Sequence, residues 1–165
     1  MKALDENKSM GVGSHIPVLI KMFQMTEGPI LELGAGTFST PLLHWLCQDS
    51  KRKMVTYETD KEYFDDEIAQ YQTDFHDVHW IDSCLNVPNT EHWGFVFIDH
   101  HPNLERKESA KRFADVADFL ILHDTLPRWE PKYLYSEIFP LFKYRKDFDQ
   151  YYPPTTVLSN THEIK

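Results

Sequence analysis

Two short stretches place histidine and aspartate directly after apolar runs of strand length. In FIDHHP, Asp99, His100 and His101 follow the run WGFVFI. In LILHDT, His123 and Asp124 follow the run DFLIL. Histidine titrates near neutral pH, and an aspartate can hold it in the tautomer that removes a proton from a bound molecule. Two carboxylates at neighbouring strand ends can instead share a hard cation such as Mg²⁺.

A glycine-rich turn, Gly34-Ala35-Gly36, lies between the apolar stretch ILEL and a helical stretch that begins near Ser39. Glycine allows the backbone to bend sharply and to approach a ligand closely, and the positive end of the helix dipole points at the same place. A phosphate and an amino-acid-like cofactor that carries a ribose are the two candidate ligands. The dinucleotide-binding pattern G-x-G-x-x-G requires glycine where this chain has Ser39, which disfavours a dinucleotide.

Apolar runs of strand length alternate with helical stretches from residue 28 onward. We predict strands at residues 30–33, 53–58, 78–81, 93–99 and 118–123, and helices at 40–48, 61–74 and 105–117. This alternation is typical of a parallel sheet with right-handed crossovers. Residues 142–148 and 155–159 are strand-like but leave no room for a helix between them, so we expect a hairpin with at least one antiparallel strand. The predicted fold class is α/β, a three-layer sandwich with a mostly parallel, Rossmann-like seven-stranded sheet that ends in an antiparallel hairpin.

A short helix is predicted ahead of the first strand. Ile16, Leu19, Ile20 and Phe23 have helical spacing, and Ser14 is available as the N-cap. We predict a single domain over residues 1–165, with an N-terminal extension and lid helix at 1–27 and a cofactor-binding core at 28–165.

Composition narrows the partners of this chain of 165 residues. Its net charge of −9 disfavours nucleic acid. The first ten residues are polar, and no apolar run approaches the roughly 18 residues of a membrane span, so we expect a soluble, cytoplasmic protein without a membrane partner. Cys47 and Cys84 are expected to be reduced thiols.

Four features at the predicted strand ends resemble the class I S-adenosylmethionine-dependent methyltransferases, from about residue 28 onward. ELGAG, residues 32–36, is similar to the acidic-x-Gly-x-Gly turn of that family. Glu58 stands where the family holds the ribose hydroxyls, and Asp82 where it accepts a hydrogen bond from the adenine amino group. Asp99 stands where the family keeps residues close to the methyl group. The resemblance therefore implies S-adenosylmethionine as the cofactor, with these candidate binding residues: Glu32, Gly34, Ala35, Gly36, Glu58, Asp82 and Asp99.

The resemblance also implies methyl transfer, and we favour an oxygen of a small molecule as the acceptor. The stretch DHHP lacks the aromatic residue of the motif that amino-directed members of the family carry there. A hydroxyl acceptor must lose its proton, either to a base or with the help of a metal. The candidate catalytic residues are His101, His123 and Asp99, with a histidine as the base. Asp99 and Asp124 are the candidate ligands if Mg²⁺ is used instead.

Two further interpretations compete with an oxygen-directed methyltransferase. The chain could be an S-adenosylmethionine-binding module that transfers no methyl group. A nicotinamide (NAD)-dependent oxidoreductase on a related fold is the other alternative, and it predicts a sheet whose strands are all parallel.

Arg106 and a group of aromatic residues have two interpretations each. Arg106 either binds a carboxylate or phosphate of the substrate or lies on the solvated face of a helix. Trp129, Tyr133 and Tyr135 belong either to a substrate lid or to the core beneath the terminal hairpin.

Overall fold

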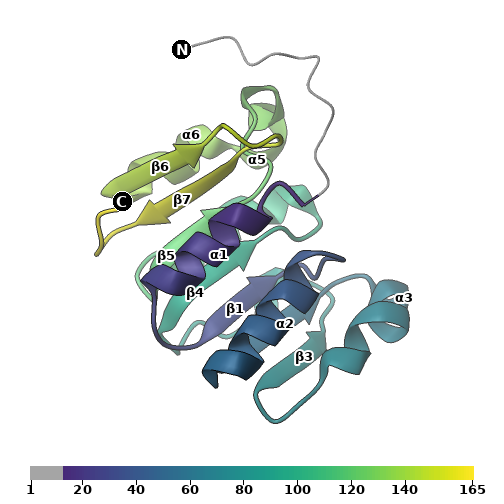
Figure 1. Ribbon diagram of the computed structural model, residues 1–165. Coiled ribbons are helices and arrows are strands. Elements are labelled where there is room, and N and C mark those ends of the chain that lie inside the picture. The colour runs from purple at the N-terminus through teal and green to yellow at the C-terminus, as the bar shows by residue number, and fades with distance from the viewer. Residues whose placement is uncertain (1–12) are drawn as a thin grey trace.

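Seven strands form one mixed sheet in the computed structural model, which describes residues 13–165 (Figure 1). Along the sheet the order is β3-β2-β1-β4-β5-β7-β6. Neighbours among β1 to β5 are parallel, and β7 is antiparallel to both β5 and β6. The strands are β1 Ile30–Leu33, β2 Met54–Glu58, β3 His76–Trp80, β4 Trp93–Ile98, β5 Ala117–Leu122, β6 Tyr144–Phe148 and β7 Thr155–Ser159.

This topology confirms the predicted fold class, including the antiparallel hairpin at the C-terminal end. The oxidoreductase hypothesis predicted an all-parallel sheet, and the antiparallel β7 contradicts it. β1 lies between β2 and β4, so the strand order reverses there. In open α/β sheets, ligands bind outside the carboxyl ends of the strands at such a reversal. A ligand site is therefore expected at the loops that follow β1, β2 and β4.

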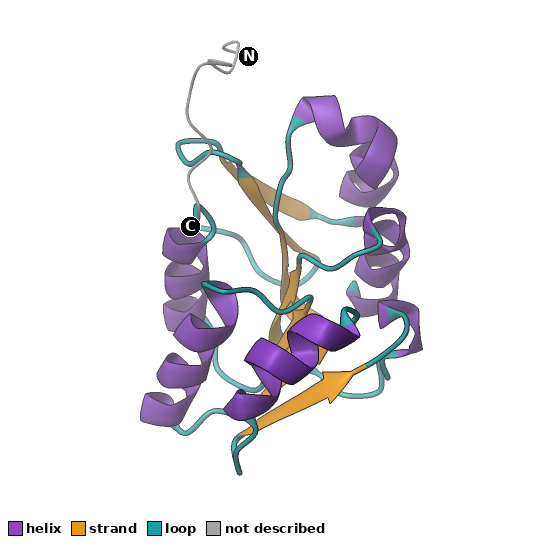
Figure 2. Cartoon of the chain, turned by 90° about the vertical axis from the view of Figure 1, so that its right-hand side faces the viewer, coloured by secondary structure: helices purple, strands orange, loops and turns teal. Residues whose placement is uncertain are grey.

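Helices cover both faces of the sheet (Figure 2). On one face, α1 Ile16–Met25 and α2 Ser39–Ser50 contribute Leu19 and Leu43 to a core with Phe95 of β4. On the other face, α4 Arg106–Phe113, α5 Glu130–Tyr133 and α6 Tyr135–Ile138 contribute residues to a second core, which includes Val96 of the same strand. Successive residues of a strand point to opposite faces, which is why the continuous apolar run of β4 serves both cores.

The first described residues differ from the sequence prediction at the helix cap. His15, not Ser14, is the N-cap of α1, and no side chain caps that helix. The Ser14 hydroxyl instead donates a hydrogen bond to the carbonyl oxygen of Pro153 at 2.8 Å. A contact across 139 positions has thus replaced the local cap, and it ties the start of α1 to the loop before β7. The predicted residues 1–12 of the N-terminal extension lie outside the described residues.

The helix predicted at 61–74 is shorter and irregular. α3 Lys61–Tyr63 continues as a π-helical turn, Phe64–Ile68, and then as a 3₁₀ turn, Ala69–Tyr71. Of this segment only Ile68 is fully buried, so packing does little to impose a regular helix. π-helical turns of this kind are frequent at functional sites.

The segment between β5 and β6 holds short helices that the sequence pattern did not predict, because three prolines and several aromatic residues interrupt its period. Two 3₁₀ turns, Pro127–Trp129 and Phe139–Leu141, flank α5 and α6. Tyr133 and Tyr135 are buried in the core on that face, which confirms the core interpretation of these two residues. Cys47 and Cys84 are free and buried, and no helix among residues 13–165 is long and apolar enough to cross a membrane.

Candidate functional site at the carboxyl edge of the sheet

The turn after β1 needs glycine at position 34 because of its packing. Gly34 has a φ of +90°, and a Cβ placed there would lie 2.5 Å from the backbone of His100. The turn after β1 therefore packs directly on the loop after β4. Gly36 is less constrained, since a Cβ there would meet only the hydroxyl of Ser39 at 2.9 Å.

The carboxylate of Glu58 connects the end of β2 to the glycine turn. Its Oε2 accepts a hydrogen bond from the backbone N–H of Ala35 at 2.8 Å. Its Oε1 accepts from the N–H groups of Thr59 and Asp60, each at 2.7 Å. A carboxylate offers about four acceptor positions, so three bonds leave room for one further donor. Glu58 is thus fixed in place and still has capacity to bind a ligand hydroxyl.

Glu32 lies beneath the turn, with no exposed surface. Its Oε2 accepts hydrogen bonds from the hydroxyls of Thr40 and Thr56, at 2.8 and 2.9 Å. The Thr40 hydroxyl in turn accepts from the N–H of Gly36. Burial raises the pKa of Glu32 to about 7, against the lowering effect of the hydroxyl donors. In this geometry Glu32 supports the turn from inside the fold.

Asp82 follows β3 and is exposed. Its Oδ1 accepts one hydrogen bond, from the side-chain amide of Asn86 at 3.0 Å. No other hydrogen bond to this carboxylate is found among residues 13–165, so acceptor positions remain on it.

Asp99 follows β4 and forms an ion pair with a buried arginine. Nη2 of Arg106 lies 2.9 Å from Oδ1 of Asp99, and Nε of Arg106 donates to the carbonyl oxygen of His100. Arg106 also stacks on the ring of Tyr133, 4.8 Å from its centroid. The interpretation of Arg106 as part of a solvated helix face is therefore wrong, because its side chain is buried beside the Asp99 carboxylate. Desolvation raises the pKa of Asp99, although Arg106 and His123 oppose that shift.

His123 and His15 meet at the end of β5. Nδ1 of His15 lies 3.4 Å from Nε2 of His123, and Nδ1 of His123 lies 3.2 Å from the hydroxyl of Thr155. Oδ1 of Asp124 is 3.6 Å from Nε2 of His123. Burial, with His123 nearby, lowers the pKa of His15 to about 3, so His15 is neutral at physiological pH.

The predicted catalytic residues therefore separate into two groups. Ligand atoms of Asp99, His123 and His15 lie within 4.8 Å of one another. His101 is exposed, and its backbone carbonyl accepts a hydrogen bond from Thr59 at 3.0 Å. Sequence reasoning missed His15, because a single histidine before an amphipathic helix indicates nothing about a partner 108 positions away.

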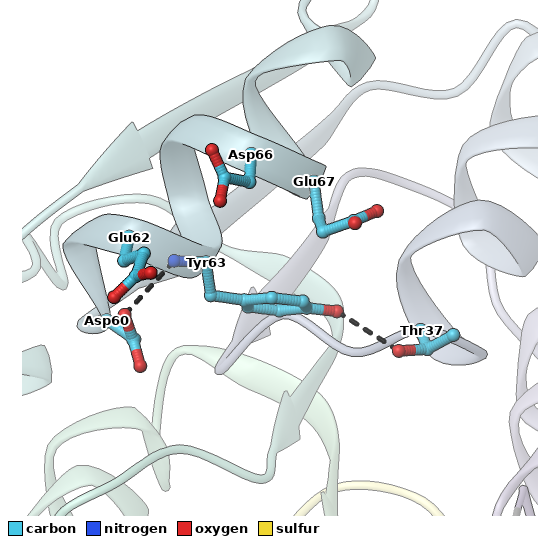
Figure 3. Close-up of a pocket in the computed structure, with 6 residues that line it drawn as sticks. All are labelled: Thr37, Asp60, Glu62, Tyr63, Asp66 and Glu67. Carbon is cyan, nitrogen blue, oxygen red and sulfur yellow. Dashed lines mark hydrogen bonds between the residues drawn. The ribbon is translucent and has the colours of Figure 1, made fainter.

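One cavity, of about 430 Å³, lies beside the glycine turn (Figure 3). The hydroxyl of Tyr63 lies 3.3 Å from that of Thr37 across it, as the close-up shows. Its lining is strongly acidic and consists of Thr37, Asp60, Glu62, Tyr63, Asp66 and Glu67. Glu58, Asp82 and Asp99 are not among these residues, so the cavity adjoins the predicted site without coinciding with it.

By sequence, no family model and no curated protein matches the chain. Solved structures do match. N-methyltransferase NodS from Bradyrhizobium japonicum aligns with a TM-score of 0.64 and 9% identity, over 90% of this chain and 94% of that one. The O-methyltransferase TomG from Streptomyces achromogenes, in complex with S-adenosylmethionine, aligns with a TM-score of 0.63 and 14% identity, over 95% of this chain and 83% of TomG. An O-methyltransferase from Bacillus cereus, in complex with S-adenosylhomocysteine, aligns with a TM-score of 0.61 and 16% identity, over 94% of this chain and 84% of that one.

These matches show that the chain has the fold of the class I S-adenosylmethionine-dependent methyltransferases, as the resemblance implied. At such low identity the likeness concerns the fold. The roles of individual residues depend on the geometry of this chain alone.

Proposed function

We propose that this protein binds S-adenosylmethionine along the carboxyl edge of the sheet and transfers its methyl group to an oxygen of a small molecule. The observation that carries this proposal is the link between Glu58 and Ala35, which holds an acid of β2 against the glycine turn of β1. This link lies at the reversal of strand order, where the fold binds ligands.

The residues present fit the chemical groups of that cofactor. Glu58 retains an acceptor position for a ribose hydroxyl, and exposed Asp82 can accept from the adenine amino group. The backbone from Gly34 to Gly36 would hold the methionine part. The acidic surroundings of the turn favour a cofactor with a positive sulfonium and ammonium group. Glu32 supports this arrangement without facing the ligand.

The cofactor supplies an electrophilic methyl group, and the chain must deal with the proton of the acceptor. His123 is the better placed of the two predicted bases, since it is buried at the strand end with Asp99 and Asp124 nearby. If its Nδ1–H donates to Thr155, its Nε2 carries the lone pair and lies near Nδ1 of His15 and the Asp99 carboxylate. Arg106 holds Asp99 in place. The acceptor proton would move to Nε2 of His123.

Calorimetric titration with S-adenosylmethionine and S-adenosylhomocysteine tests the proposal. We expect both to bind, and the substitution Glu58→Gln to weaken binding by about 1 to 3 kcal/mol, because one partner of charged hydrogen bonds is changed. Asp118→Asn is the matched control, since Asp118 lies near the amino end of β5 at the opposite edge. Absence of binding at millimolar ligand would refute the proposal. Binding without transfer to any hydroxyl acceptor would favour the non-catalytic module.

A further inference from the structure

Three potential metal ligands from distant parts of the chain converge at the carboxyl edge. His15 precedes α1, Asp99 follows β4, and His123 follows β5, and one ligand atom from each lies within 4.8 Å of the others. His15 and His123 are buried, and Asp99 is partly buried. Among residues 13–165, no other group of three His, Cys, Asp or Glu side chains lies close enough together to hold one ion.

The two histidines face each other through ring nitrogens. Nδ1 of His15 is 3.4 Å from Nε2 of His123. Two ligands that each lie about 2.0 to 2.1 Å from a tetrahedral ion are themselves roughly 3.4 Å apart. The contact between His15 and His123 is a long hydrogen bond between two rings, and Nε2 of His15 is buried without any partner, so the protein itself binds this ring weakly. The spacing of the two nitrogens is that of neighbouring metal ligands.

The surroundings also suit a metal site. The second nitrogen of His123 contacts the hydroxyl of Thr155, and such a contact commonly orients a metal-binding histidine. Arg106 engages Oδ1 of Asp99 and leaves the other carboxylate oxygen available. Asp124 adds a second negative charge 3.6 Å from His123. Asp99 and Asp124 together outweigh the positive charge of Arg106.

We propose that His15, Asp99 and His123 bind one divalent transition metal ion, with Zn²⁺ as the representative. Two imidazoles and one carboxylate select such ions, whereas Mg²⁺ prefers oxygen ligands. The site differs from the Asp99–Asp124 pair expected from sequence, since Asp99 is retained as a ligand, His15 before α1 is added, and His123 takes the place of Asp124. Three protein ligands leave a coordination position open, as in catalytic zinc sites.

A role for this ion in the reaction rests on the proposed methyl transfer. With the ion bound, Nε2 of His123 would be a ligand and would not act as the base. The ion would instead bind the acceptor oxygen and lower the pKa of its proton, which would pass to solvent. The existence of the site does not depend on that role, so metal binding and cofactor binding are measured separately.

The test uses the full chain, treated with chelator, dialysed, and titrated with ZnCl₂ by calorimetry and by native mass spectrometry. We expect one Zn²⁺ per chain. His15→Gln and His123→Gln should each weaken binding by at least about 100-fold, the upper end of the loss seen even for residues that only orient a ligand. Mg²⁺ under the same conditions should not compete.

His92→Gln is the matched control, because His92 and His162 flank Asp118 at distances of 2.9 and 3.9 Å near the opposite edge. This variant should bind Zn²⁺ like the wild type. Loss of binding in His92→Gln with retention in His15→Gln would overturn the proposal, as would the absence of stoichiometric binding or a preference for Mg²⁺.

A second measurement avoids substitutions that could disturb folding. In wild-type protein with ¹⁵N-labelled histidine, Zn²⁺ should shift the imidazole signals of two of the nine histidines. Assignment of the shifted signals to any pair other than His15 and His123 would contradict the site. Titration with S-adenosylmethionine in the same sample shows whether cofactor binding, and with it the proposed function, stands independently.

Discussion

Glu32 places a carboxyl group where water does not reach it. Two threonine hydroxyls donate to its Oε2, while its Oε1 has no hydrogen-bond partner. A buried acid with one unpartnered oxygen favours its protonated form, which is why the pKa rises to about 7. The acid that begins the glycine-turn motif therefore acts on the stability of the turn.

The effect of the substitution Glu32→Gln on the free energy of unfolding should be more favourable at pH 8 than at pH 5. Above pH 7 the folded wild type carries a desolvated charge, whereas the unfolded chain ionises near pH 4.5, so folding of the wild type weakens as the pH rises between these values. Glutamine removes this dependence. We expect the difference in unfolding free energy between variant and wild type to move by about 2.5 kcal/mol toward the variant from pH 5 to pH 8.

Urea denaturation at both pH values measures this difference, with Glu137→Gln as an exposed control. An equal difference at pH 5 and pH 8 would show that Glu32 titrates normally in the folded state.

Gly34→Ala should destabilise the fold much more than Gly36→Ala. At position 34 alanine meets a positive φ and the backbone of His100 at 2.5 Å, so neither the residue nor its neighbour can adjust cheaply. We expect a loss of at least about 2 kcal/mol. At position 36 only the Ser39 hydroxyl must move. Thermal and urea unfolding of both variants compare them directly, and similar losses would contradict the packing argument.

At the scale of elements, Arg106 joins the first turn of α4 to the end of β4. Its side chain contacts the Asp99 carboxylate, the His100 carbonyl and the Tyr133 ring. Arg106→Met should cost about 3 kcal/mol, because it leaves a mostly buried carboxylate without its partner. Lys107→Met is the matched control, since its neighbour Glu137 is exposed and such pairs contribute less than about 1 kcal/mol.

Chemical denaturation provides the measurement for these two variants. If Arg106→Met proves as stable as Lys107→Met, the ion pair contributes little, and Asp99 is held by its strand alone.

At the scale of the whole molecule, buried histidines on both sides of the sheet make folding sensitive to acid. Burial lowers the pKa values of His15 and His100 to about 3 and that of His76 to about 4. Unfolding exposes these rings to water, where they protonate near pH 6.5. Their contribution to stability is complete above pH 6.5 and is lost as the pH falls below it.

Unfolding free energy should therefore fall by about 2 to 3 kcal/mol per pH unit between pH 6 and pH 5. Three histidines take up protons on unfolding in this range, and Glu32 releases one, so the histidines dominate. Urea denaturation at pH 7.5, 6 and 5 measures how the unfolding free energy changes with pH. The substitution His76→Gln should lower the number of protons taken up on unfolding by about one. A flat profile would show that these rings remain accessible to protons in the folded state.

The order and type of the main elements could be predicted from the amino-acid sequence. Apolar runs such as that of β4, and the helical spacing from Ile16 to Phe23, follow from local periodicity, because each residue's burial depends on its place within its own strand or helix. Strands and helices alternate as in a parallel sheet, and the last two strands lie too close in sequence for a helix between them. Few sheet topologies satisfy both conditions. The strand-end positions of Glu58, Asp82 and Asp99 followed from the same pattern.

Contacts between side chains that are distant in sequence could not be predicted and depend on the packing of the folded chain. His15 joins His123 across 108 positions, Ser14 joins the loop before β7 across 139, and Arg106 turns inward to Asp99. Local pattern carries no information on such contacts, since they arise when the faces of the sheet are covered and distant loops pack at one edge. The need for glycine at position 34 also came from this packing, because the residue that excludes a side chain there, His100, belongs to another strand's loop.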